Sequence, residues 1–386
     1  MAEDRRKRAT VTPVYLDYQA TTPLAPEAFE AMVPLLRDQF GNPHSAHRMG
    51  RQAAAVVEVA RDAVSAALGL PGGRLVFTSG ATEALNIAIS GAARLAGPDR
   101  RKIVTIATEH AAVRDTVEAM AHHGYEAVLL PVGPDGLVDL ERARREIDTG
   151  TALVAAMLVN NEIGVIQPVE ALASLARDAG ALFLCDAVQG FGRVPMPANA
   201  DMIAISAHKV HGPKGIGGLW LRDGLTLPPL IHGGGQEGGL RSGTLSPALC
   251  AGFGAAARLL DSHMQSDAAH VEMLWNAALA LFPGWTVNGS MTRRYHGNLN
   301  IRRAGLDGAR LLSDCRDVSF SLGSACASGS GRPSHVLQAL GLSQKEAGGS
   351  VRIGFGRYTT LEELERAGEA INRAAGQQDL PPQGAL

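Results

Sequence analysis

The sequence lacks the features of membrane, nucleic-acid-binding and disulfide-stabilised proteins. Its four cysteines are scattered over 386 residues and form no CxxC pair, which argues against a disulfide framework and a structural zinc site. No apolar run is long enough to cross a bilayer, and MAEDRRKRAT at the start has no apolar core like that of a signal peptide. The formal net charge is only -2, so the charge balance does not call for nucleic acid. These absences predict a protein of the reducing cytoplasm.

Signatures of nucleotide and metal binding are also missing. There is no GxxxxGK[ST] loop, and neither GIGG nor GFG belongs to a GxGxxG between a strand and a helix. This argues against a P-loop nucleotide site and against a nicotinamide-dependent oxidoreductase. His44 with His47 and His208 with His211 have a spacing that suits a metal, but no third ligand is evident, so we predict no metal site.

What the sequence does contain is an alternation of apolar strands and amphipathic helices. A helical pattern over 53–68 ends at Gly69, and RLVFTSG then precedes a second helical segment. Further apolar segments predict strands covered by helices on both faces: 102–108, 126–132, 152–159 and 181–187. The pattern predicts an α/β fold with a mainly parallel sheet.

The length of the chain and a change of pattern near residue 260 indicate a second domain. In that part, GWTVNGS, HGNLNIRR, DVSFSLGS and SVRIGFGR predict short strands between helices, as in a smaller α+β unit. We expect 21–260 to form the large domain and 261–386 the small C-terminal domain. Residues 1–20 are expected to pack with the small domain.

Two residues that carry charge lie where strands end. Lys209, in SAHKVHGPKGIGG, follows the apolar run DMIAIS, and ligands of open α/β sheets bind at such strand ends. A lysine there can form a Schiff base with a carbonyl cofactor, although an isolated lysine is more often a solvated surface charge. Asp186 ends the strand LFLCD and suits a cationic ring nitrogen, although an isolated strand-end aspartate is more simply a loop cap.

An anion site and an acid-base group are predicted at neighbouring strand ends. Gly80, Ala81 and Thr82 lie at a junction from strand to helix, where free N–H groups and the helix dipole favour an anion. An ordinary helix N-cap explains the same residues equally well. Ser206 adds a second hydroxyl, and His110 follows the strand KIVTIAT at the same sheet edge.

Cys326 differs from the other cysteines in its surroundings. It lies in SLGSACASGSG, a run of small residues that predicts an accessible loop in which a thiolate can react. Cys185, Cys250 and Cys315 lie in contexts typical of buried cysteines. We therefore expect Cys326 to be the reactive thiol.

Taken together, these segments resemble the cysteine desulfurases, in the class V branch of the fold-type I pyridoxal-phosphate enzymes. The similarity covers almost the whole chain, in order and spacing, through YLDYQATTP, GNPHSAHRMG, FTSGATEALN, TEHAAV, VNNEIGVIQP, DAVQG, SAHKVHGPKG, RSGT, GSACAS and VRIGFGR. Such a set is far more specific than any one motif. It implies a large domain with a mainly parallel seven-stranded sheet, a smaller α+β domain and pyridoxal 5'-phosphate as cofactor.

The resemblance implies how the cofactor is held. By position, Lys209 binds its aldehyde covalently and moves protons, Asp186 pairs with the ring nitrogen, and His110 stacks on the ring and serves in acid-base transfer. Gln189 hydrogen-bonds the ring hydroxyl. The implied phosphate contacts are Ala81, Thr82, Ser206, His208 and, from a partner subunit, Thr244.

The resemblance also implies the reaction. Asn161, which also lies against the cofactor, and Arg352 hold the carboxylate of L-cysteine. Cys326 takes the substrate sulfur as a persulfide, and alanine is released. A homodimer then passes the sulfur to an acceptor or an iron-sulfur scaffold protein. A selenocysteine lyase, an aminotransferase or a kynureninase-like hydrolase on the same scaffold remains the alternative, and Cys326 discriminates because a transaminase needs no mobile thiol.

Overall fold

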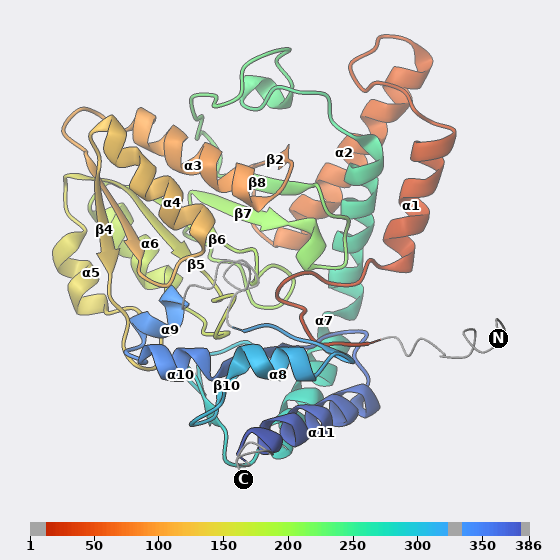
Figure 1. The fold of residues 1–386 in the computed structure, drawn as a ribbon. Coiled ribbons are helices and arrows are strands. Elements are labelled where there is room, and N and C mark those ends of the chain that lie inside the picture. The colour runs from red at the N-terminus through yellow and green to blue at the C-terminus, as the bar shows by residue number, and fades with distance from the viewer. Residues whose placement is uncertain (1–12, 323–333, 380–386) are drawn as a thin grey trace.

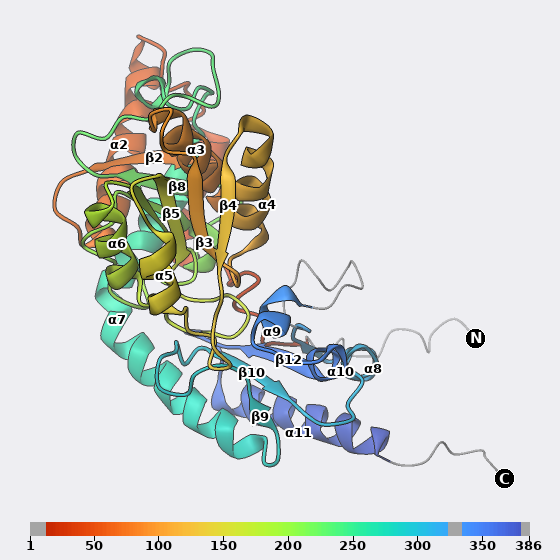
Figure 2. The same ribbon diagram turned by 90° about the vertical axis from the view of Figure 1, so that its left-hand side faces the viewer.

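The computed structural model describes residues 13–322 and 334–379, which form two lobes (Figures 1 and 2). The larger lobe is built on a seven-stranded sheet in the order β2-β8-β7-β6-β5-β3-β4. Strands β3 to β7 pair in parallel, and β8 is antiparallel to both of its neighbours. The strands are β2 Arg74–Thr78, β3 Lys102–Ile106, β4 Glu126–Leu130, β5 Thr151–Met157, β6 Leu182–Asp186, β7 Met202–Ser206 and β8 Gly217–Leu221. The predicted α/β fold with a mainly parallel sheet is confirmed.

Helices cover both faces of this sheet, which is why its central strands are apolar throughout. One face packs against α3 and α4, and the other against α2, α5, α6 and the first half of α7, while α1 lies on α7 (Figure 1). The helices are α1 Pro26–Arg37, α2 Arg48–Leu68, α3 Ala81–Leu95, α4 Ala111–Ala119, η1 Met120–His123, α5 Leu140–Glu146, α6 Val169–Asp178, η3 Glu237–Gly239 and α7 Pro247–Leu281. No helix in the described part of the chain is both long and apolar enough to span a membrane.

The predicted helix over 53–68 is present as α2 and begins five residues earlier, at Arg48. Its buried residues Val57, Ala60, Val64 and Leu68 recur at helical spacing and join the core under the sheet. The helix ends at Gly69, whose φ of 67° is the left-handed conformation that glycine adopts most easily. The pattern therefore located the helix end better than its start.

The smaller lobe contains an antiparallel sheet in the order β12-β10-β9 and a parallel pair, β1 with β11. Its core also includes Val14 and Leu16 and the second half of α7, which runs unbroken through residue 260. The division at residues 20 and 260 stays a prediction. The elements are β1 Val14–Tyr15, β9 Thr286–Val287, β10 Asn298–Arg302, α8 Gly308–Asp314, β11 Val318–Ser319, α9 His335–Ala339, α10 Gln344–Gly348, β12 Ser350–Gly354 and α11 Leu361–Gln378.

Candidate active site

The carboxyl ends of the central strands open onto a cavity of about 520 Å³. Strand β6 ends at Asp186, and β7 ends at Ser206, directly before the short helix η2 (Ala207–Lys209). Most of the predicted site residues line this cavity: Ala81, Thr82, His110, Asn161, Asp186, Gln189, Ser206, His208, Lys209 and Arg352. The fold thus brings together side chains that are far apart in the sequence.

Lys209 extends from η2 into this cavity. Its Nζ donates to the backbone carbonyls of Gln19 and Ala20, at 2.5 and 2.8 Å. The segment that supplies these carbonyls follows β1, so a lysine of the large lobe is held by backbone next to the small lobe. The amine is therefore fixed at the cavity, as a covalent anchor requires.

Asp186 is 6% exposed, and one of its carboxylate oxygens accepts from the N–H of Val188 at 3.0 Å. Burial raises the pKa of Asp186 above its ordinary 3.8, and the N–H of Val188 and the nearby His110 and Lys209 oppose that increase. A cation bound in the cavity would further stabilise the charged carboxylate. Asp186 is thus suited to pair with a protonated ring nitrogen.

The elevated pKa of Asp186 predicts a stability effect in the cofactor-free protein. As the pH rises above 3.8, the unfolded chain loses this proton before the folded chain does, so the carboxylate progressively lowers the free energy of unfolding. Asp186→Asn should therefore raise the melting temperature at pH 7.5 by about 2 °C and have little effect near pH 4. Differential scanning calorimetry at the two pH values measures this.

A matched control for this prediction is Asp139→Asn. Asp139 is exposed and caps α5 by accepting from the N–H of Arg142 at 2.9 Å, and asparagine caps helices about as well. This variant should melt like the wild type at both pH values. An Asp186→Asn protein that is less stable than the wild type at pH 7.5 would contradict the account of a charge buried at a cost.

A second carboxylate, that of Glu109, lies near Asp186. Glu109 is fully buried, and its Oε1 accepts from the N–H of Met157 at 2.7 Å. Burial and then the charge of Asp186 raise the pKa of Glu109 well above 4.5. No role was predicted for Glu109, because a strand-end glutamate has no local signal of burial.

His110 lies at the N-cap of α4 and lines the cavity. Its Nδ1 accepts from the N–H of Ala112 at 3.1 Å, so in the neutral ring the proton is on Nε2. Burial lowers the pKa of His110. The charge of Asp186 opposes this decrease, and the charge of Lys209 adds to it. The residue is thus a neutral imidazole with a fixed tautomer, free to exchange a proton through Nε2.

The predicted anion site is formed by the start of α3 together with the end of β7. Ser79, Gly80, Ala81 and Thr82 line the cavity, as do Ser206 and His208. Burial and the neighbouring Lys209 and Lys214 lower the pKa of His208 to about 4, so its ring is neutral and can donate one hydrogen bond. The helix N-terminus adds free N–H groups that favour a phosphate.

The start of α3 is held in place by two neighbouring residues. Glu83, in the first turn of α3, pairs with Arg241 at 2.6 Å and accepts from the N–H of Ser79 at 2.6 Å. Gly217 passes so close that an added Cβ would lie 2.7 Å from the carbonyl oxygen of Ile205 and 2.8 Å from Gly80. This close packing at Gly217 was not predicted, because the only signal in the sequence was its place in a run of glycines.

Arg352 projects from β12 of the small lobe into the cavity lining and is 1% exposed. It donates to the carbonyl of Asn161 at 3.0 Å and to a carboxylate oxygen of Asp17 at 2.6 Å. Two buried polar atoms, Nε of Arg352 and Oδ1 of Asn161, have no hydrogen-bond partner in the described structure. The free donor of Arg352 suits a small anionic ligand in the cavity, whereas the oxygen of Asn161 is an acceptor that an N–H of a ligand would satisfy.

Comparisons with known proteins give the same assignment as this geometry. The model of the family described as "Aminotransferase class-V" matches residues 14–367. A protein of Rickettsia bellii (strain OSU 85-389) named "Cysteine desulfurase IscS" is 41% identical over 383 residues, which covers 96% of this chain and 93% of that protein. The chain belongs to the class-V aminotransferase family, among the cysteine desulfurases.

Solved structures of this family have the same fold. One described as "NIFS-LIKE PROTEIN" superposes with a TM-score of 0.88 at 32% identity, covering 95% of this chain and all of that one. Another, described as "SspA in complex with cysteine", gives a TM-score of 0.80 at 34% identity, covering 90% of this chain and 99% of that one. As a cysteine desulfurase of the class-V aminotransferases, the chain is a pyridoxal-phosphate enzyme.

The side chains present in this class-V aminotransferase fit pyridoxal phosphate. The cavity supplies an amine for the aldehyde at Lys209, a buried carboxylate for the ring nitrogen at Asp186, and a helix N-terminus for the phosphate. The amide of Gln189 lies at the same cavity. The buried, unpartnered Oδ1 of Asn161 is a further polar group that a bound ligand would satisfy.

Two predicted residues are not part of this cavity as described. Thr244 is exposed and does not line it, and Cys326 lies outside the described residues. The other cysteines, Cys185, Cys250 and Cys315, are buried and free. No cluster of three potential metal ligands occurs within 13–322 and 334–379.

Proposed function

We propose that the cavity desulfurates L-cysteine. In the net reaction, the bond between Cβ and sulfur breaks, a sulfur–sulfur bond to the thiol of Cys326 forms, and the carbon skeleton leaves as alanine. Sulfur is only transferred, so no external oxidant or reductant is required. The observation that carries the proposal is the placement of Lys209, Asp186 and Arg352 around one cavity in a chain with these relatives.

When bound, pyridoxal phosphate supplies an electron-accepting ring conjugated to the substrate nitrogen. Lys209 would hold the aldehyde carbon and would carry protons between Cα and Cβ of the substrate. Asp186 would keep the ring nitrogen protonated through its buried negative charge. His110 would exchange a proton through Nε2 at the same cavity.

Substrate orientation is assigned to Arg352 and Asn161. A guanidinium whose Nη2 is already fixed by Asp17 at 2.6 Å offers a pre-oriented planar donor set to the carboxylate of cysteine. Arg352 comes from the small lobe and Asn161 from the large lobe, so a bound carboxylate would contact both lobes. The solved relative described with cysteine supports this choice of substrate.

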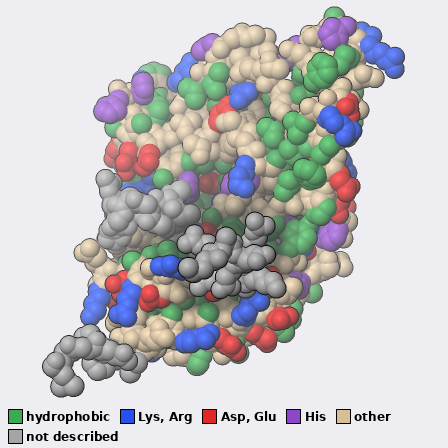
Figure 3. Space-filling view, turned by 45° about the vertical axis from the view of Figure 1, so that its right-hand side comes forward, with side chains coloured by type: hydrophobic (Ala, Val, Ile, Leu, Met, Phe, Trp, Pro, Cys, Tyr) green, Lys and Arg blue, Asp and Glu red, His purple; other side chains and the backbone are tan. Residues whose placement is uncertain are grey.

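We further propose that the enzyme acts as a homodimer. Thr244 is exposed in one chain, which fits a residue that completes the phosphate site of a second chain. Large apolar side chains are exposed on or next to α1, at Phe29, Leu36 and Phe40, with exposed fractions of 57, 65 and 75%. Figure 3 shows hydrophobic side chains gathered on that side of the molecule, and such a patch suits burial in an interface.

For the sulfur acceptor, we propose only the kind of molecule, which is a protein. A persulfide on Cys326 would be passed to a protein acceptor, including an iron-sulfur scaffold, as the relatives named IscS suggest. The cytoplasm is the proposed compartment, because free thiols persist in a reducing environment. The three described cysteines are free, which supports this.

A product assay tests the proposed function. Purified protein with pyridoxal phosphate, L-cysteine and a thiol reductant should release sulfide and alanine in equal amounts. An aminotransferase would instead form a keto acid, and a selenocysteine lyase would act on selenocysteine and leave cysteine unchanged. Either of those two results would overturn the assignment.

A further inference from the structure

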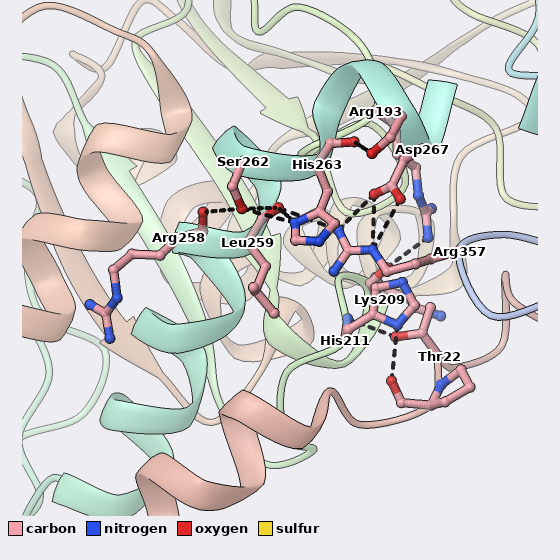
Figure 4. Close-up of polar contacts among 12 residues, drawn as sticks. Thr22, Arg193, Lys209, His211, Arg258, Leu259, Ser262, His263, Asp267 and Arg357 are labelled. Carbon is pink, nitrogen blue, oxygen red and sulfur yellow. Dashed lines mark hydrogen bonds and ion pairs between the residues drawn. The ribbon is translucent and has the colours of Figure 1, made fainter. Parts of the chain in front are cut away.

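Arg193 lies behind the catalytic lysine and does not line the main cavity. It follows β6 in the loop that carries Gln189, and it borders a second cavity of about 230 Å³ on the opposite side of Lys209. Its Nη2 donates to the backbone carbonyl of Lys209 at 2.7 Å (Figure 4). Its Nη1 donates to Oε1 of Gln189 at 2.9 Å and to the carbonyl of Gln189 at 3.2 Å.

These contacts determine how the amide of Gln189 is turned. A guanidinium has donors only, so the group that faces Arg193 must be the amide oxygen. The amide nitrogen of Gln189 then points the other way, where it donates to the carbonyl of Gln19 at 2.9 Å. That carbonyl also accepts from Nζ of Lys209. A primary amide has two N–H groups, and the second one remains available to the cavity that Gln189 lines.

The guanidinium of Arg193 is itself held from the small lobe. Its carbon lies 5.2 Å from the ring centroid of Tyr295, at a distance typical of a cation–π contact. The nearby Arg357 is bound separately, to the carboxylate of Asp267 (Figure 4). Arg193 therefore has one set of partners in the active site and one in the small lobe.

We infer that Arg193 is a positioning residue for the cofactor: its donors turn the amide of Gln189 so that nitrogen faces the cavity, and they fix the backbone of Lys209. The inference rests on the proposed function only in taking the cavity as a pyridoxal-phosphate site. A donor that faces the ring hydroxyl favours the deprotonated oxygen and lowers the pH at which the lysine-bound cofactor titrates. Without Arg193 the amide oxygen loses its donor and only the bond to the carbonyl of Gln19 holds the amide, so this preference is weakened.

The experiment is a pH titration of the visible absorption of the holoenzyme in matched variants. Arg193→Met should raise the titration midpoint by about one pH unit, since one hydrogen bond is lost. Gln189→Leu should raise it similarly, and the double variant should shift no further than Gln189→Leu alone, because Arg193 acts through Gln189. Arg193→Lys keeps the charge and one donor, so a smaller shift is expected.

Arg100→Met is the control for a purely structural loss. Arg100 is also half-buried, and it donates to two backbone carbonyls, those of Thr151 and Ala179, at 2.9 Å each, away from the cavity. The Arg100→Met variant should have a lower melting temperature than the wild type and the same titration midpoint. An Arg193→Met midpoint equal to the wild-type value, or shifts of Arg193→Met and Gln189→Leu that add in the double variant, would overturn the inference.

The same data separate this inference from the proposed function. A wild-type protein that binds the cofactor and releases no sulfide would refute the function, while the titration would still decide on Arg193. A protein that desulfurates cysteine and shows no shift in Arg193→Met would refute the inference alone.

Discussion

Replacing Lys209 with alanine is expected to abolish sulfide release from L-cysteine, with a loss of about 10³-fold or more. In the proposed mechanism, the amine would hold the aldehyde and carry protons between the substrate carbons. In the structure it is fixed at the cavity by the carbonyls of Gln19 and Ala20. Sulfide production under saturating L-cysteine, in the presence of added pyridoxal phosphate, measures the loss.

The covalent role of Lys209 has its own readout and an internal control. Borohydride reduction of the wild-type holoenzyme should attach the cofactor to Lys209, as found by peptide mass analysis. Lys214 lines the same cavity and should carry no label, because it lies at the proposed phosphate end and away from Asp186. The Lys209→Ala protein should take up no label at all. Labelling of Lys214 in the wild type, or full activity of Lys209→Ala, would refute the assignment.

The sequence was sufficient to locate groups that follow strands. Asp186 is the last residue of β6, and His110 and Lys209 follow the ends of β3 and β7 by a few residues; these three strands run in parallel within one sheet. Because parallel strands place their carboxyl ends at one edge, local patterns were enough to predict that these side chains meet. The same rule explains why the anion site at the start of α3 lies beside them.

Contacts between residues far apart in the sequence could not be predicted in this way. The pair Arg352 and Asp17 joins residues 335 positions apart within the small lobe, and Nζ of Lys209 is bonded to a carbonyl 190 positions away. Neither contact leaves a periodic or local signal, since each depends on how distant segments pack in the folded chain. The orientation of Gln189 was equally inaccessible, because it depends on the donors of Arg193.

Long-range contacts also position the chain on both sides of the segment that contains Cys326. Before it, Ser321 pairs with Arg352 through two backbone hydrogen bonds, of 2.7 and 3.2 Å. After it, Ser334 donates to a carboxylate oxygen of Glu162, and Nε2 of His335 contacts the carbonyl of Glu109 at 2.9 Å. Both ends of the segment are therefore attached next to the cavity, beside Arg352 and His110.

The length of the chain between Ser321 and Cys326 allows Cys326 to be the nucleophile. Its replacement is the second change for which we expect a large loss of activity. Cys326 follows Ser321 by five residues, which span at most about 18 Å, so the chain length is compatible with Cys326 acting on a substrate held at Arg352. Cys326→Ala should reduce sulfide release to background, a loss of about 10³-fold or more, and leave the visible absorption and the Lys209 label unchanged. After one turnover without reductant, mass spectrometry should find one extra sulfur atom on Cys326 in the wild type.

Cys315→Ala is the matched control for Cys326→Ala. Cys315 is buried in the small-lobe core, with its thiol 3.8 Å from the carbonyl of Ala370, and burial raises its pKa and keeps it protonated. Its removal should cost some stability and leave sulfide release intact. Only a thiolate attacks sulfur at a useful rate. The comparison of the two variants therefore distinguishes loss of the reactive thiolate from loss of a cysteine that plays no part in the reaction. Desulfuration that survives in Cys326→Ala and fails in Cys315→Ala would reverse the assignment of the nucleophile.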